Sequence, residues 1–198
     1  MTTSRVGYIG LGNLGAHLAA SLLRAGFAVT VTDLDRAAAE PLLERGAAWG
    51  GSAAEVAAAS DVVLTCLPSS AAVDKVVTGP DGVLDGLAAG GTWIDQSTND
   101  RSETLRLGAI VHGAGRRMLE APVTGGVHKA AAGEITVLVG GDQALFEEHR
   151  SVLEAVGDPV LYMGELGSAA LIKVITNMLA FVHLVAAGEA LMLAARGG

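Results

Sequence analysis

A glycine-rich turn between a strand pattern and a helix pattern is the feature that most constrains this chain. The apolar run of residues 6–9 predicts a short buried strand, and glycines follow it in G-x-G-x-x-G spacing. Apolar residues at helical spacing come next and end at Gly26, and a second β-rich run occupies residues 27–32. The order strand, tight turn, helix, strand predicts the opening unit of a parallel α/β sheet.

The positions of Gly10, Gly12 and Gly15 have a physical meaning in such a unit. The first glycine permits the tight turn, the second lets the backbone approach a pyrophosphate, and the third lets helix and strand pack closely. The helix beginning near Asn13 would present free N–H groups and the positive end of its dipole to that pyrophosphate. An ordinary βα turn is the alternative, because 27 glycines in 198 residues produce glycine patterns by chance. The ordered sequence of elements favours a dinucleotide site.

The second strand ends in Asp33, 18 residues after Gly15. An acid at this place is suited to accept hydrogen bonds from the adenosine ribose hydroxyls, and its charge would repel a 2′-phosphate. We therefore expect NAD as the cofactor. NADP is the alternative, since Arg36 would be able to contact a 2′-phosphate if Asp33 turned away.

The remaining chain alternates between strand and helix patterns, which predicts a doubly wound, mostly parallel Rossmann-type sheet. Pro68, Ser97 and Thr124 each follow a predicted strand, and the carboxyl ends of parallel strands share one edge of a sheet. Strands are expected at 61–67, 91–95, 117–120, 135–139 and 160–163, and helices at 35–46, 69–77, 101–112 and 143–156, with a brief helix capped by Ser52 and an irregular stretch through Trp49.

Composition excludes several classes of protein. The chain is 51% hydrophobic, which is enough for a sizeable core, and its net charge is −8 with no basic cluster. Nucleic acid and anionic membranes are therefore not expected partners. The single cysteine, Cys66, excludes an internal disulfide framework, and the histidines show no metal-ligand spacing, so no metal site is expected. The short segment before the first strand, Met1 to Arg5, leaves no room for a signal peptide, and we expect a cytoplasmic protein.

A long apolar run at residues 169–195 has the length of a membrane span. It carries Lys173, Asn177, His183 and Glu189, which are costly in lipid for a single helix. We therefore expect a helix buried on most sides by protein. The predicted organisation is a dinucleotide-binding domain at 1–166 and a long interdomain helix at 167–198.

Lys173 lies in the middle of this apolar helix, and Asn177 lies one turn later on the same face. An ammonium at such a place loses hydration, which lowers its pKa and suits it to proton transfer. The alternative is a lysine that extends its ammonium to solvent beside an asparagine bonded to the backbone. The spacing alone leaves both interpretations open.

Four segments resemble, in order, motifs of the β-hydroxyacid dehydrogenases. This family includes 3-hydroxyisobutyrate dehydrogenase, tartronate semialdehyde reductase and, more distantly, 6-phosphogluconate dehydrogenase. The family motifs are G-x-I-G-L-G-x-M-G, D-x-S-T, A-P-V-S-G-G and K-x-x-N-N. The matching segments are GYIGLGNLG at 7–15, IDQST at 94–98, APVTGGV at 121–127 and KVITN at 173–177.

The resemblance implies reversible oxidation of a small β-hydroxy acid, similar to 3-hydroxyisobutyrate, by a nicotinamide cofactor. It implies that Lys173 is the general base or acid and that Asn177 orients the substrate. Thr124, Gly125 and Gly126 would hold the substrate carboxylate, and Ser97 would lie near both nicotinamide and substrate. The residues implied in cofactor binding are Gly10, Leu11, Gly12, Asn13, Leu14, Gly15, Asp33, Leu67, Pro68 and Ser97.

The chain departs from the family pattern at a few positions. Thr124 replaces the usual serine, Thr176 replaces the first asparagine of K-x-x-N-N, and Gln96 is unusual before Ser97. Two other functions compete with the dehydrogenase. An imine reductase shares the fold but usually replaces the catalytic lysine, and a cofactor-binding module would have lost catalysis.

The resemblance also bears on the end of the chain. Family members continue with an all-helical domain that closes the cleft and drives dimerisation, whereas this sequence ends at Gly198. The sequence leaves two interpretations open, a fragment of a longer protein and a naturally short protein. Without that domain the helix at 169–195 exposes an apolar surface, so we expect a homo-oligomer, a dimer or a tetramer, formed through this helix.

Overall fold

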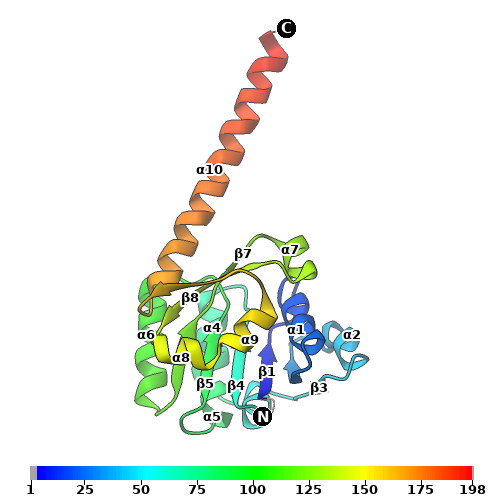
Figure 1. The fold of residues 1–198 in the computed structure, drawn as a ribbon, viewed down its shortest axis with the longest axis vertical. Coiled ribbons are helices and arrows are strands. Elements are labelled where there is room, and N and C mark those ends of the chain that lie inside the picture. Colours follow the sequence, from blue (N-terminus) through cyan, green and yellow to red (C-terminus); the bar gives the residue numbers. More distant parts are fainter. Residues whose placement is uncertain (1–3, 198) are drawn as a thin grey trace.

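A mostly parallel sheet with helices on both faces forms the body of the protein (Figure 1). The computed structural model describes residues 4–197. Residues 1–3 and Gly198 lie outside the described residues. The expectation of no signal peptide depends partly on residues 1–3. The strands are β1 (Arg5–Ile9), β2 (Ala28–Thr32), β3 (Ala48–Trp49), β4 (Val62–Thr65), β5 (Thr92–Asp95), β6 (Arg117–Glu120), β7 (Val123–Thr124), β8 (Thr136–Gly141) and β9 (Val160–Gly164).

Helices connect most of these strands, as expected for parallel neighbours. They are α1 (Gly15–Arg24), the 3₁₀ helix η1 (Arg36–Ala39), α2 (Glu40–Leu43), α3 (Ala53–Ala58), α4 (Ser70–Thr78), α5 (Val83–Gly86), α6 (Arg101–Gly113), α7 (Val127–Ala132), α8 (Gln143–Glu148), α9 (Arg150–Val156) and α10 (Ser168–Gly197).

The strand order is β3-β2-β1-β4-β5-β6-β8-β7, and β9 pairs with β8. Neighbours from β3 to β6 run parallel, whereas β8 is antiparallel to β6 and β7. The order reverses at β1, because β2 lies on one side of it and β4 on the other. Ligands of such sheets bind outside the carboxyl ends of the strands at this reversal. The predicted fold class, a Rossmann-type doubly wound sheet, is confirmed.

The two faces of the sheet have separate apolar cores, because side chains of one strand alternate between faces. Val6 and Tyr8 of β1 face a core shared with α1 and α9, whereas Ile9 faces the core shared with α3 to α6. Both Tyr8 and Trp93 are fully buried. The continuous apolar runs of the central strands follow from this burial on both faces.

Several predicted elements differ in the structure. The helix expected at 35–46 is a 3₁₀ turn followed by α2, because Pro41 lacks an N–H and starts a new helix near its first position. The helix expected at 143–156 divides at His149, whose buried ring turns inward to bond the Thr92 hydroxyl at 2.9 Å. The stretch expected to be irregular through Trp49 contains β3, and β7, α5 and α7 form in segments for which no strand or helix was expected.

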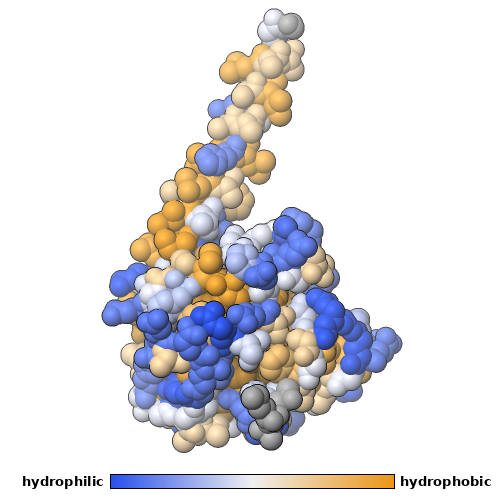
Figure 2. Space-filling model, viewed as in Figure 1, coloured by the Kyte–Doolittle hydropathy of each residue, from blue (hydrophilic) through white to orange (hydrophobic). Residues whose placement is uncertain are grey.

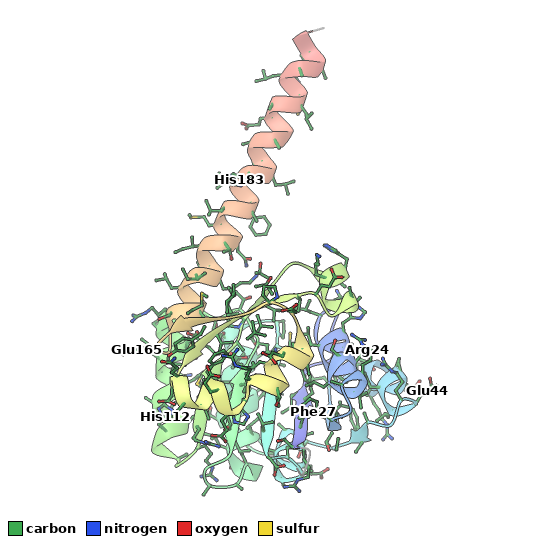
Figure 3. All side chains as sticks on the ribbon, in the orientation of Figure 1. Arg24, Phe27, Glu44, His112, Glu165 and His183 are labelled. Atoms are coloured by element: carbon green, nitrogen blue, oxygen red, sulfur yellow. The ribbon has the colours of Figure 1, made fainter. Side chains whose placement is uncertain are left out.

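Helix α10 projects from the domain as a single rod (Figure 1). Only Ala169, Ala170 and Lys173 of this helix are buried, so the prediction that protein covers most of it is wrong for the described residues. Space-filling representation shows apolar side chains along its projecting length (Figure 2). It is the one helix within residues 4–197 that is long and apolar enough to cross a membrane. His183 lies on the projecting part, away from the sheet (Figure 3).

Candidate functional site

A cavity of about 790 Å³ lies along the carboxyl edge of the sheet. Its walls come from the turn after β1, the end of β2, the segments after β4 and β5, the β7 region and the first turns of α10. These segments are far apart in sequence and meet because their strands are parallel neighbours. The volume lies within the usual range for small-molecule and cofactor sites, about 300–1,000 Å³.

The structure brings together all but two of the residues singled out from the sequence. Leu11 is buried beneath the turn, and Asn177 is half-buried one turn beyond Lys173, and neither lines the cavity. Their proposed roles stay predictions. The predicted residues that do line the cavity are Gly10, Gly12, Asn13, Leu14, Gly15, Asp33, Leu67, Pro68, Ser97, Thr124, Gly125, Gly126 and Lys173.

The glycine turn after β1 has the geometry that a dinucleotide requires. Gly10 has a φ of +95°, and a Cβ there would collide with the Cys66 carbonyl oxygen. A Cβ at Gly15 would collide with the Gly10 carbonyl oxygen. A Cβ at Gly12 would meet no protein atom within 4 Å, so packing does not explain this glycine. The open space over Gly12 and the positive dipole end of α1 fit a pyrophosphate.

Asp33 ties the end of β2 to the glycine turn. One carboxylate oxygen accepts a hydrogen bond from the Leu11 N–H at 2.5 Å, and the other accepts from the Asp35 N–H at 2.9 Å. The side chain lines the cavity and keeps acceptor capacity toward it. Arg36 does not line the cavity, because its guanidinium lies over the Trp49 ring, 5.3 Å from the centroid. The cavity wall at the end of β2 therefore carries the negative charge of Asp33 and lacks the positive charge of Arg36.

A buried network positions Ser97 at the cavity. Asp95 is 3% exposed and accepts hydrogen bonds from the Thr65 hydroxyl at 2.8 Å, the Ser97 N–H at 3.1 Å and the Asn99 amide at 2.7 Å. Burial raises the pKa of Asp95, and these hydrogen bonds oppose that rise. The Ser97 hydroxyl accepts from the Leu67 N–H at 2.9 Å, which joins the segments after β4 and β5. The two loops thus form one rigid wall.

The loop predicted to hold a carboxylate lies opposite this wall. Val123 and Thr124 form β7, which pairs with β8, so the loop begins from a fixed edge of the sheet. Gly125 and Gly126 follow with φ of +134° and +83°, conformations that residues with a Cβ rarely adopt. Both glycines are exposed, and their backbone is open to the cavity. Glycine is therefore needed here for conformation as well as for close approach of a ligand.

Lys173 is the buried cation of the cavity. The residue is 9% exposed and lies in the second turn of α10. Burial lowers the pKa of its ammonium below the ordinary lysine value, as expected from its apolar surroundings. Ion pairs recorded for residues 4–197 do not include Lys173. A lysine with a lowered pKa at a cavity wall is suited to give and take a proton.

The lining residues that were not identified from the sequence as site residues include a lysine, a cysteine and a glutamine. Lys75 reaches the cavity from α4, Cys66 follows β4, and Gln96 precedes Ser97. Burial raises the pKa of the Cys66 thiol to about 12, so it lines the cavity as a neutral group. Position at a strand end was an available signal for Cys66 and Gln96, whereas no sequence pattern shows that Lys75 faces the cavity. Within the described part of the chain no group of three potential metal ligands forms.

Comparison with known proteins identifies the family. The family model of the NAD binding domain of 6-phosphogluconate dehydrogenase matches residues 5–164. This chain belongs to that family. The matched segment includes the glycine turn, Asp33, the Asp95 network and the Thr124–Gly126 loop, and it ends before α10.

Relatives of known or assigned activity extend beyond this domain. The 2-(hydroxymethyl)glutarate dehydrogenase of Eubacterium barkeri is 34% identical over 194 residues, which are 98% of this chain and 64% of the relative. The probable mitochondrial 3-hydroxyisobutyrate dehydrogenase of Dictyostelium discoideum is 34% identical over 197 residues, 100% of this chain and 61% of the relative. The chain therefore spans less than two thirds of the length of these curated relatives.

Solved structures give the same result. Mycobacterium tuberculosis 3-hydroxyisobutyrate dehydrogenase, solved with L-serine, has a TM-score of 0.92 and 34% identity, covering 98% of this chain and 66% of that one. The expected resemblance to β-hydroxyacid dehydrogenases is confirmed. A Myxococcus stipitatus imine reductase in complex with NADP⁺ has a TM-score of 0.87 at 22% identity, covering 94% of this chain and 64% of that one, and shares the fold alone.

Proposed function

We propose that this chain is the cofactor domain of an NAD-dependent dehydrogenase acting on a small β-hydroxy acid. The observation that carries the proposal is the place of Lys173, a buried lysine lining the same cavity as the glycine turn and the Thr124–Gly126 loop. One cavity thus holds a dinucleotide cradle, a proton-transferring group and backbone donors for an anion. The names of the relatives, two of which are hydroxy-acid dehydrogenases, support the same substrate class.

The chemistry divides between the residues and the bound cofactor. Hydride transfer is the chemistry that a nicotinamide cofactor supplies when it is bound. The residues of the glycine turn hold its pyrophosphate, and Asp33 accepts from the ribose hydroxyls. The N–H groups of Gly125 and Gly126 and the Thr124 hydroxyl orient the substrate carboxylate. Nζ of Lys173, in its neutral form, takes the proton of the substrate hydroxyl, and returns it in the reductive direction.

Hydroxy-acid turnover tests this function. The chain, supplied with the helical domain of a relative, is incubated with NAD⁺ and small β-hydroxy acids, and NADH formation is followed. We expect oxidation of β-hydroxy acids and none of the matched α-hydroxy acids, in which the reacting carbon lies one bond closer to the carboxylate. Turnover of cyclic imines without turnover of hydroxy acids would favour the imine reductase. Cofactor binding without any turnover would favour a non-catalytic module.

Cofactor choice gives a sharper prediction. Replacing Asp33 by asparagine removes the charge that would repel a 2′-phosphate and keeps an acceptor for the Leu11 N–H. We expect the affinity for NADPH to rise relative to that for NADH on the order of tenfold, equivalent to about 1.4 kcal/mol. The ratio of the two dissociation constants is the quantity to measure, since any distortion of the turn affects both.

Asp35→Asn is the matched control, because it removes an exposed charge two residues away that caps η1. It should leave the ratio unchanged. If the ratio of the NADPH and NADH dissociation constants is unchanged in Asp33→Asn too, another residue discriminates between the two cofactors.

We also propose that α10 joins copies of this chain into a homo-oligomer. Phe181, Leu184 and Leu191 are each 67% exposed or more, and their spacing places them on one side of the helix, where a second copy would cover them. The double variant Phe181→Gln and Leu184→Gln should shift the chain toward monomer in analytical ultracentrifugation while circular dichroism shows that it remains folded. A wild-type chain that is monomeric at all concentrations, or that binds lipid vesicles instead, would contradict the proposal.

A further inference from the structure

A buried carboxylate at the end of β6 holds the first turn of α10. Glu120 is 2% exposed, and its two carboxylate oxygens accept hydrogen bonds from three backbone N–H groups of the helix start. These come from Gly167 at 2.6 Å, Ala169 at 3.0 Å and Ala170 at 2.9 Å. Such N–H groups have no partner within the helix, and they lie at the positive end of its dipole.

The carboxylate has no cation beside it among the recorded ion pairs of residues 4–197. Burial raises the pKa of Glu120, and the three N–H groups oppose that rise. A buried carboxyl group held only by backbone donors is costly unless the geometry is exact. The backbone of Gly140 leaves room for it, because a Cβ at that residue would collide with the Glu120 carboxylate.

Glu120 lies between the two halves of the proposed substrate site. Along the chain, Thr124 lies four residues after Glu120, and the intervening Ala121 and Pro122 are buried. On the other side, Lys173 follows Ala169 by four residues, one helical turn along the same face. Beyond Lys173 the side chains of α10 are half-buried or exposed, so contacts at its first turns fix its position on the domain.

We propose that Glu120 is a positioning residue that fixes Nζ of Lys173 relative to the Thr124–Gly126 loop. The proposal rests on the proposed function of Lys173, but it makes a claim of its own about the structure. Three bonds to one side chain restrain both the axial position and the rotation of α10. Rotation or sliding of the helix by a part of a turn would move Nζ out of the cavity wall.

The test uses the whole 198-residue chain and needs no substrate. In Glu120→Gln one oxygen is replaced by a donor, which cannot accept from the helix N–H groups. Ala169 and Ala170 bond different oxygens of Glu120, so one of the two N–H groups loses its acceptor. We expect amide exchange at that residue to accelerate roughly tenfold or more, the usual effect of losing a hydrogen bond to a charged group. Mass spectrometry of competitive lysine acetylation across pH gives the second readout. The midpoint for Lys173 should rise toward that of a free lysine, because the residue loses burial.

The chain supplies its own controls. Lys75 and Lys129, the other two lysines, report general changes in reactivity, and their acetylation should be the same in the variant and the wild type. Glu165→Gln removes the same charge at the base of α10 (Figure 3), but Glu165 is exposed, and its carboxylate accepts none of the helix-start N–H groups that Glu120 holds. Its main-chain carbonyl accepts from the Ser168 N–H at 3.1 Å, a bond that the substitution does not change. Glu165→Gln should change neither readout. Gly140→Ala displaces the Glu120 carboxylate without altering its chemistry and should reproduce both effects of Glu120→Gln.

The outcomes separate this proposal from the proposed function. Glu120→Gln and Gly140→Ala are compared at a temperature at which circular dichroism shows both to be folded. If Glu120→Gln does not fold, the result for Gly140→Ala alone tests the proposal. Unchanged exchange at the helix start together with an unchanged Lys173 midpoint would overturn the positioning role. A fall in the Lys173 midpoint would also overturn the positioning role. It would mean that Glu120 acts on Lys173 through its negative charge, whose loss disfavours the ammonium, and not through the position of the helix. Absence of hydroxy-acid turnover would affect only the proposed function, because neither readout depends on it.

Discussion

Replacing Lys173 by alanine is expected to lower hydroxy-acid oxidation by about 10²- to 10⁴-fold, the usual contribution of a general acid or base. The affinity for NADH should stay nearly unchanged, because Lys173 lies at the α10 wall and the glycine turn is intact. The measurement is NADH formation by the chain supplied with a helical domain, beside a fluorescence titration with NADH. Retained turnover in the variant would remove Lys173 from the mechanism.

Two further observations separate proton transfer from charge or packing at this residue. Lys173→Arg keeps a positive charge but cannot lose a proton at neutral pH, so it should be as inactive as the alanine variant. Burial lowers the pKa of Lys173, and the neutral form is the base. The rate of oxidation should therefore rise with pH through a midpoint below the ordinary lysine value of 10.5, and the rate of reduction should fall. An active arginine variant would indicate that charge alone suffices.

Replacing Gly12 by valine should abolish dinucleotide binding and leave the fold intact. A Cβ there meets no protein atom within 4 Å, so the valine side chain would extend into the space of the pyrophosphate. We expect the NADH affinity to fall by at least about a hundredfold, as if two charge-assisted hydrogen bonds were lost. The melting temperature should hardly change. Isothermal titration and thermal denaturation of the same preparation give both numbers.

Two other glycines serve as controls for this result. Gly113→Val places the same side chain in open space at the end of α6, outside the cavity, and should preserve NADH binding. Gly15→Ala should lower the melting temperature, because its Cβ would collide with the Gly10 carbonyl oxygen. Tight binding of NADH to the Gly12 variant would mean that the cofactor does not pass over the turn.

The central unit was predictable because local patterns and the tertiary fold agree there. The Val6–Ile9 run, the glycine turn and Asp33 each constrain the backbone in the same way, and parallel strands bring their carboxyl ends to one edge. The clustering of Pro68, Ser97 and Thr124 followed from that rule without any knowledge of side-chain contacts. The position of Lys173 at the cavity did not follow, since the spacing left its orientation open.

Other features depended on interactions that no local pattern contains. His149 divides a helix because its ring reaches Thr92, 57 residues away. The two residues of β3 are too few to show an alternating pattern. The apolar composition of α10 predicted burial, but burial also requires something to cover the helix, and within residues 4–197 nothing does beyond its first turns. The role of Glu120 likewise depends on N–H groups 47 to 50 residues further along the chain.

The central claim is that the carboxyl edge of this sheet binds NAD through the glycine turn and Asp33. The most direct test is a titration of the 198-residue chain with NADH and, separately, with NADPH, followed by the fluorescence of the nicotinamide. We expect saturable binding of NADH that is clearly tighter than binding of NADPH, and loss of that binding in Gly12→Val. Failure of the folded chain to bind either dinucleotide, or binding that Gly12→Val does not weaken, would contradict it.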